Sequence, residues 1–286
     1  VLNKLNLAIG RSLEVIGSEA ATNVGQGFGL AVSWPLYEKL QVAQGLPASC
    51  LGNRAAGSCQ PNVNRQKYSS LVSAGGVTDK DARLFNPALP AGSDIQVQRR
   101  VGTSGTQSAS NAFFLNTPCA SGEPGGGLSP AGNNAAGSVF YNSNNVEIVS
   151  NAGSGDVKAK LTSATDAGKY AIGVLSLENV PSSAEKFAYV KLNGVSPNLD
   201  AKQRQTAIDG DYEFWYELVA FTGADTLPGI FPEGAALIDA TRLALGDPAI
   251  TDLTGLFVTP AAGYTGSNVS KGYKNGNACS PAMQNL

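Results

Sequence analysis

The chain has 286 residues, of which 42% are hydrophobic and only 15% are charged, with 20 basic residues against 22 acidic ones. This composition excludes a disordered chain and supplies enough apolar material for one large domain or two modest ones. The small net charge excludes attraction of nucleic acid or anionic lipid by bulk charge, and no run approaches the ~20 consecutive apolar residues of a membrane span.

The first third of the chain alternates short apolar strands with helices. We expect a strand at 27–33 and a helix at 36–44, because apolar residues first run together and then recur at helical spacing. A polar loop at 48–66 leads into a short helix at 65–74, which a glycine pair closes. A second strand at 94–101 follows, since its apolar residues occupy alternate positions.

The middle of the chain contains the strongest fold signal. Residues 118–145 are rich in Gly, Ser, Asn and Pro, and we expect an irregular insertion there. A strand at 146–149, a helix at 157–164 and a strand at 170–177 come next. This rhythm is typical of an α/β unit with parallel strands.

The C-terminal third continues with a strand at 189–192, an aromatic segment at 212–218 and a helix at 232–245. A polar tail covers 259–286. We therefore expect one α/β domain over 1–258, followed by that tail.

The chain contains no histidine, and this excludes several kinds of active site. Ser-His-Asp triads, Cys-His pairs and histidine-bound zinc cannot be built, so we expect no catalytic residue, no metal and no cofactor. Serine-based hydrolysis through Ser104 would need a buried lysine instead of histidine, and no lysine lies near it in sequence.

The four cysteines include no Cys-x-x-Cys pair, so disulfides are favoured over a redox motif or a zinc ribbon. The spacing of Cys50 and Cys59 fits a local bridge, which leaves Cys119 and Cys279 to tie a loop to the tail. The other two connectivities, and four reduced cysteines in a cytosolic protein, remain open. We expect an oxidising compartment and a secreted or periplasmic protein, whose export signal does not precede Val1 in this chain.

One segment has strong chemical meaning, the run RRVGTSGTQ at 99–107 between the predicted strand and a helix expected at 108–115. A helix N-terminus attracts anions, because its first N–H groups lack partners and the macrodipole is positive there. An arginine adds a two-pronged donor, hydroxyls add further donors, and glycines allow close approach. The candidate ligand-binding residues are Arg100, Thr103, Ser104, Gly105 and Thr106. Alternatively, Thr103 and Ser104 only cap the helix and both arginines are solvated.

Secondary candidates lie at three other places. Arg99 precedes the motif, and Ser154, Gly155 and Asp156 form a second turn before a helix. There the Asp156 side chain can itself satisfy the free N–H groups, so capping is favoured. Glu178 and Asn179 follow a strand, at the kind of edge where α/β sheets bind ligands. The large aromatic residues are expected in the core rather than in a ligand wall, namely Trp34, Phe214, Trp215 and Tyr216.

Residues 24–245 resemble the phosphate-type periplasmic solute-binding proteins, and in particular a secreted branch of that superfamily. The resemblance is carried by RRVGTSGT at 99–106, AIGV at 171–174, YVKLNGVSP at 189–197 and YEFW at 212–215. It implies a type II periplasmic-binding-protein-like α/β fold with a mostly parallel sheet. It also implies that a small anion such as phosphate is held by helix N-termini and hydroxyls.

Two departures from that family matter. Its acidic residue two positions after the motif arginine accepts a hydrogen bond from protonated phosphate, but Gly102 stands there in this chain. Its opening strand and Ser/Thr-Gly turn have no match in residues 1–30. The N-terminal part of the first lobe is therefore expected to be missing, or the fold to serve another purpose.

We expect an exported solute-binding protein rather than an enzyme. The alternative is a structural subunit of a secreted or surface assembly, such as a filament. The Gly/Asn/Ser-rich stretches would suit this role, and the protein would then self-assemble.

Overall fold

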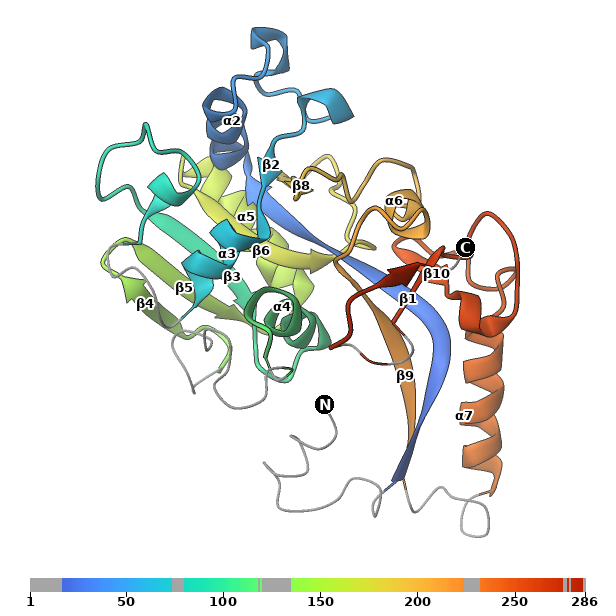
Figure 1. Cartoon of the computed structure of the whole chain (residues 1–286). Helices are drawn as coiled ribbons and strands as arrows, with labels where there is room; N and C mark the ends of the chain where they lie inside the picture. The colour runs from blue at the N-terminus through green and yellow to red at the C-terminus, as the bar shows by residue number, and fades with distance from the viewer. Residues whose placement is uncertain are drawn as a thin grey trace. The chain divides into compact units, whose positions relative to one another are not determined.

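The structure is a computed structural model and describes residues 17–73, 80–117, 119, 135–223, 232–274, 277 and 279–284. It divides into two compact units, one made of 1–27 with 200–286 and the other of 28–199 (Figure 1). The boundary predicted at 258 between a domain and a tail stays a prediction.

The unit of residues 28–199 is built on one sheet with the strand order β1-β6-β3-β5-β4. At its centre β3 pairs in parallel with both β5 and β6, whereas β1 and β4 pair antiparallel at the two sides. The expected α/β fold class with a mainly parallel centre is confirmed. The strands are β1 (Gly17–Ser33), β3 (Ile95–Arg100), β4 (Val139–Ser143), β5 (Val146–Asn151), β6 (Ala171–Ser176) and β7 (Phe187–Tyr189), which pairs with the end of β1.

Helices cover both faces of this sheet. Val97, Arg99 and Ile148 lie on the face that α3 and α4 cover. On the other face, Val157 and Leu161 of α5 pack into a fully buried cluster with alternate residues of β6. The helices are α2 (Trp34–Ala43), α3 (Arg65–Val72), α4 (Gly105–Leu115) and α5 (Ser154–Asp166).

Close approach of two strands explains one glycine in the core. A Cβ on Gly173 of β6 would stand 2.7 Å from the carbonyl oxygen of Gln98 in β3 and 3.2 Å from a methyl carbon of Val157. A larger residue would push β3 away from β6, or α5 away from the sheet. The parallel centre therefore depends on a glycine at this position.

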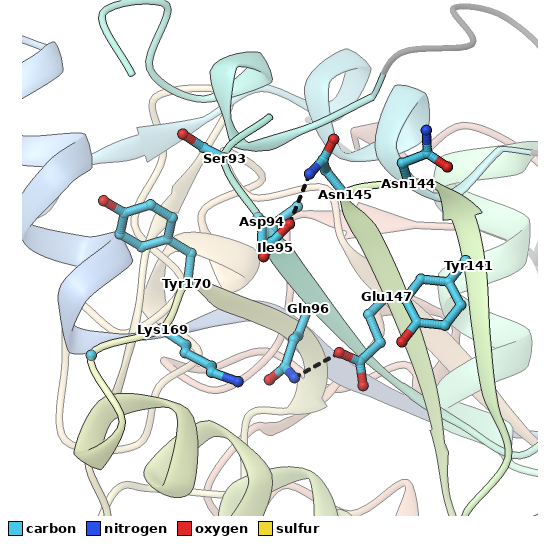
Figure 2. A pocket seen from close by; sticks show the side chains of 11 residues that line it. Ser93, Asp94, Ile95, Gln96, Tyr141, Asn144, Asn145, Glu147, Lys169 and Tyr170 are labelled. Atoms are coloured by element: carbon cyan, nitrogen blue, oxygen red, sulfur yellow. Dashed lines mark hydrogen bonds between the residues drawn. The ribbon is translucent and has the colours of Figure 1, made fainter. Parts of the chain in front are cut away.

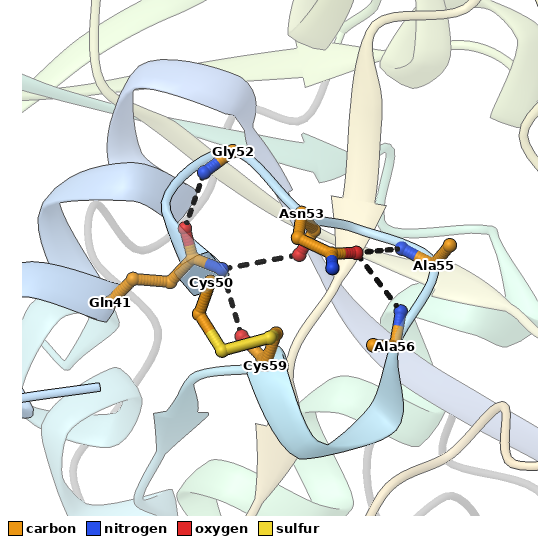
Figure 3. The surroundings of a disulfide bond; sticks show 7 residues. All are labelled: Gln41, Cys50, Gly52, Asn53, Ala55, Ala56 and Cys59. Atoms are coloured by element: carbon orange, nitrogen blue, oxygen red, sulfur yellow. Dashed lines mark hydrogen bonds between the residues drawn. A yellow bond between two sulfur atoms is a disulfide. The ribbon is translucent and has the colours of Figure 1, made fainter. Parts of the chain in front are cut away.

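The first cysteine pair forms the predicted local disulfide, Cys50–Cys59. Gln41 of α2 holds the loop, because its amide donates to the carbonyl oxygens of Asn53 and Cys59 and accepts from the N–H of Gly52 (Figure 3). Cys119 and Cys279 are disulfide-bonded as well, so the chain has no free cysteine.

In the other unit, residues 17–27 of β1 pair antiparallel with β9 (Trp215–Gly223) and β10 (Leu256–Val258). Trp215 and Phe257 meet edge to face with their ring centroids 5.3 Å apart. The aromatic residues expected in the core are buried at Phe214, Trp215 and Tyr216, whereas Trp34 is half-buried. Helix α7 (Pro232–Leu245) has the predicted bounds, yet none of residues 233–245 is buried.

The remaining elements are short. They are η2 (Ala48–Cys50), η3 (Gly57–Cys59), β2 (Asn62–Val63), η4 (Ala82–Leu84), β8 (Lys191–Leu192), α6 (Gln205–Ile208), η6 (Pro260–Ala262), β11 (Gly272–Tyr273) and β12 (Met283–Gln284). Among the described residues, no helix has the length and apolar character needed to cross a membrane.

Several predicted boundaries are wrong, among them the starts of β1 (Gly17 instead of 27) and of α5 (Ser154 instead of 157). Helix α4 begins at Gly105 instead of 108, because the chain turns from extended to helical directly after Ser104. Residues 139–143, expected in an irregular insertion, form β4, which pairs with β5 through the backbone while its side chains are half-buried or exposed. The strand begins with Val, Phe and Tyr, which favour strands, but it lies between stretches rich in Gly, Asn and Ser that indicate a loop. Helix α3 ends at Val72, before the expected end at 74, because the backbone of Ser73 is already extended. Most of the insertion lies outside the described residues.

Candidate functional site

Two helices begin at the same edge of the sheet. Strands β3 and β5 are parallel neighbours, with Arg100 opposite Asn151 at their carboxyl ends. Helix α4 follows β3 and helix α5 follows β5 within a few residues. Because the carboxyl ends of parallel strands meet at one edge, both helix N-termini lie there, which is where open α/β sheets bind ligands.

The start of α4 has no side-chain cap. Ser104 is the N-cap residue with extended backbone (φ −80°, ψ 131°), but its hydroxyl makes no capping hydrogen bond. Thr103 and Gly105 are exposed, and nothing lies within 4 Å of the position that a Cβ on Gly105 would take. Ser104 itself is buried, so this helix start presents the backbone of Gly105 and the exposed Thr103 to open space, at the positive end of the helix.

Gln107 fastens this turn to the end of β3. Its side-chain oxygen accepts a hydrogen bond from the backbone N–H of Arg100 at 2.9 Å, and its amide donates to Asn111 at 2.9 Å. Sequence reasoning did not select this residue. The sequence signal that could have found Gln107 is the Ser-x-x-Gln spacing of a capping box, in which the glutamine side chain reaches back toward the helix start.

The start of α5 is capped by its own side chain. The carboxylate of Asp156 accepts a hydrogen bond from the N–H of Gly153, the N-cap residue, at 2.9 Å. This is the capping arrangement that the sequence favoured for Asp156. The hydroxyl of Ser154 remains on the outside of the turn, half-buried, and faces Arg100.

Arg100 joins the two helix starts. Its Nη1 donates to the hydroxyl of Ser154 and its Nη2 to the carbonyl oxygen of Ala152, both at 2.9 Å. Its Nε is buried and makes no hydrogen bond. Within the described ranges, no carboxylate forms an ion pair with this guanidinium. A fixed positive charge therefore lies at the start of α5, on a residue whose backbone N–H is bonded to Gln107 of α4.

Arg99 lies on the opposite face of the sheet, because alternate residues of a strand point to opposite sides. It is buried, its Nε donates to the hydroxyl of Ser150 at 3.0 Å, and its guanidinium lies 5.3 Å from the centre of the Phe140 ring. Burial lowers the pKa of Arg99, and burial also raises the pKa of the nearby Tyr68 phenol. The structure thus brings Arg100 and Ser154 together and separates Arg99 from them.

Glu178 and Asn179 follow β6, whose carboxyl end lies at the same edge as that of β3. They bond to their own turn, because Glu178 accepts from the hydroxyl of Ser176 at 2.6 Å and Asn179 donates to the Ser176 carbonyl oxygen at 3.0 Å. The Tyr189 hydroxyl also donates to the carbonyl oxygen of Asn179. These contacts shape the edge of the sheet.

Gly102 is exposed and has no side chain that could accept a hydrogen bond. The phosphate-type binding proteins that this segment resembles have a carboxylate at this position. The arrangement therefore consists of donors: one guanidinium, hydroxyls and helix N–H groups. Such a set can bind an oxyanion without accepting a proton from it. The described residues contain no group of three or more acidic or cysteine side chains that could hold a metal ion.

No family model and no curated protein matches this sequence. Two solved structures are similar over 86% of the chain. One is a possible phosphate binding protein from Planctomyces limnophilus DSM 3776, with 13% identity, a TM-score of 0.48 and 68% of that chain covered. The other is PstS from Borrelia burgdorferi, with 12% identity, a TM-score of 0.46 and 74% of that chain covered.

Proposed function

We propose that the unit of residues 28–199 binds a small oxyanion, such as phosphate, at the edge of the sheet where α4 and α5 begin. The observation that carries the proposal is Arg100, a guanidinium fixed at the start of α5 that no described carboxylate neutralises, on the strand that leads into the uncapped start of α4. A bound anion would supply both the missing negative charge and the missing acceptors.

Each candidate residue has a distinct role in this proposal. Arg100 provides the counter-charge and remaining donors on its guanidinium. The hydroxyls of Thr103, Ser104 and Thr106 and the N–H groups of the first turn of α4 complete the donor set. Gly105 lets the anion approach the backbone closely, because no side chain stands in front of it.

The donor set also bears on selectivity. Because Gly102 offers no acceptor for a protonated phosphate oxygen, the site is proposed to accept fully deprotonated anions such as sulfate as readily as phosphate. The disulfides support an exported protein that works in an oxidising compartment. A structural subunit that reuses the fold stays a prediction.

Calorimetric titration with phosphate and with sulfate tests the proposal. Arg100→Ala is expected to weaken binding by ~2–5 kcal/mol, since a desolvated charge contact is lost. Arg242→Ala is the matched control, because Arg242 belongs to α7 in the other unit and pairs with Asp239. Equal affinities of the two variants, or no binding by the unmodified protein, would contradict an anion site at Arg100.

A further inference from the structure

A hollow lies at the opposite edge of the same sheet from Arg100, where the parallel strands begin. Its volume is about 570 Å³, which is within the range of small-molecule sites. Its walls come from the start of β3, the turn between β4 and β5, and the turn before β6 (Figure 2). It is separated from Arg100 by the length of β3, roughly 20 Å for a strand of six residues.

A row of polar side chains crosses the floor of this hollow, formed by Lys169, Gln96 and Glu147 with Tyr141 at the end (Figure 2). The amide of Gln96 donates to Oε2 of Glu147 at 2.9 Å, which fixes both side chains. The side-chain oxygen of Gln96 and Oε1 of Glu147 stay available as acceptors. In the described part of the chain, Lys169 forms no ion pair, so its ammonium group stays available as a donor.

A second pair of polar side chains is fixed on the upper wall. Asn145 donates to Oδ1 of Asp94 and to the carbonyl oxygen of Gly92, both at 2.8 Å. Its amide therefore fixes the Asp94 carboxylate in the lining of the hollow. Fixed donors and acceptors cost a ligand less ordering than mobile ones.

Two tyrosines stand on opposite sides of the hollow in Figure 2, Tyr170 before β6 and Tyr141 on β4. The Tyr141 side chain is 68% exposed, although it belongs to a strand. A tyrosine combines an apolar ring face with a hydroxyl that donates and accepts. Such a pair suits a ligand that has apolar C–H faces and hydroxyl edges.

We propose that this hollow is a binding site for a neutral saccharide of one or two sugar units. Two carboxylates and one ammonium group line it, so a phosphate-like anion meets net repulsion there. An apolar ligand would leave the fixed carboxylates and amides without partners. Sugar hydroxyls can donate to Asp94 and Glu147 and accept from Lys169, while the pyranose face packs on Tyr141.

Saturation-transfer NMR of the full chain with glucose, galactose, N-acetylglucosamine, maltose and cellobiose tests this site. At least one of these sugars is expected to bind at millimolar concentration. Tyr141→Ala and Glu147→Gln should each weaken that binding about tenfold, because each removes a ring contact or a hydrogen bond to a charged group. Tyr264→Ala is the matched control, an exposed tyrosine in the other unit.

Three results would overturn the proposal: no binding of any of the five sugars, binding that both variants retain, or displacement of the bound sugar by phosphate. Circular dichroism of each variant shows whether it is folded, and Glu147→Gln keeps the size of the side chain in case Tyr141→Ala disturbs β4.

Discussion

Two helix starts at one edge of the same sheet are built differently. At α5 the N–H of the N-cap residue Gly153 donates to the carboxylate of Asp156 in the first turn, whereas at α4 the N–H of Ser104 donates to the carbonyl oxygen of Val101 and the first turn has no acidic residue. Arg100 lies between them and is tied to α5 through Ser154. The difference places a negative charge in the first turn of α5 and none in that of α4, so the positive end of α4 is the better suited of the two to attract an anion.

The largest effect is expected from a substitution that removes the packing of α5 against the sheet. Leu161 of α5 is fully buried in the cluster with β6. Leu161→Ala should lower the free energy of unfolding by ~2–5 kcal/mol, because it deletes buried methyl groups and leaves a cavity. Urea unfolding measures this loss, and anion titration under native conditions should show weaker binding, since Ser154 no longer holds Arg100 firmly. A loss below ~1 kcal/mol would show that α5 is not held by this cluster.

The next largest effect concerns the start of α5 and distinguishes its role from that of the start of α4. Asp156→Ala should destabilise the protein by ~0.5–2 kcal/mol, because the N–H of Gly153 loses its partner. The affinity for phosphate should change little, since Asp156 is not among the proposed ligand contacts. Thermal unfolding and calorimetry measure the two quantities. A large loss of affinity without loss of stability would reverse the roles assigned to the two helix starts.

A pair of glycine substitutions sharpens the comparison further. Gly105 and Gly155 both have open space where a Cβ would stand. Gly105→Ala and Gly155→Ala should each leave the stability unchanged or raise it by up to ~1 kcal/mol, because alanine favours the helix. Only Gly105→Ala should weaken anion binding, since its methyl group occupies the approach to α4. Equal binding by both variants would contradict close approach of an anion at Gly105.

The smallest effect concerns the N-cap serine. Ser104→Ala should change the free energy of unfolding by less than ~0.5 kcal/mol, which is less than usual for this position, because its hydroxyl makes no capping bond. Phosphate affinity should still fall, as one proposed donor is lost. A stability loss as large as that of Asp156→Ala would instead identify Ser104 as an ordinary cap.

Local patterns predicted many of the elements well. Helix α7 matched its expected bounds, since proline at the first position of a helix and glycine after its last position are strong start and stop signals. The disulfide Cys50–Cys59 followed from spacing and a polar loop. Strand β4 was missed, because an edge strand pairs through its backbone and needs no alternation of apolar side chains.

By itself, the sequence determined the α/β class, the first disulfide and the segment that carries an anion-binding pattern at a helix start. These depend on periodicity and on neighbours along the chain. Only the tertiary structure decided that Arg99 is buried against Ser150 and Phe140 while Arg100 reaches Ser154, more than fifty positions away in the chain. The reason is physical: alternation along β3 puts adjacent residues on opposite faces, but the register of β3 against β5 decides which residues each of them meets, and local sequence does not encode that register.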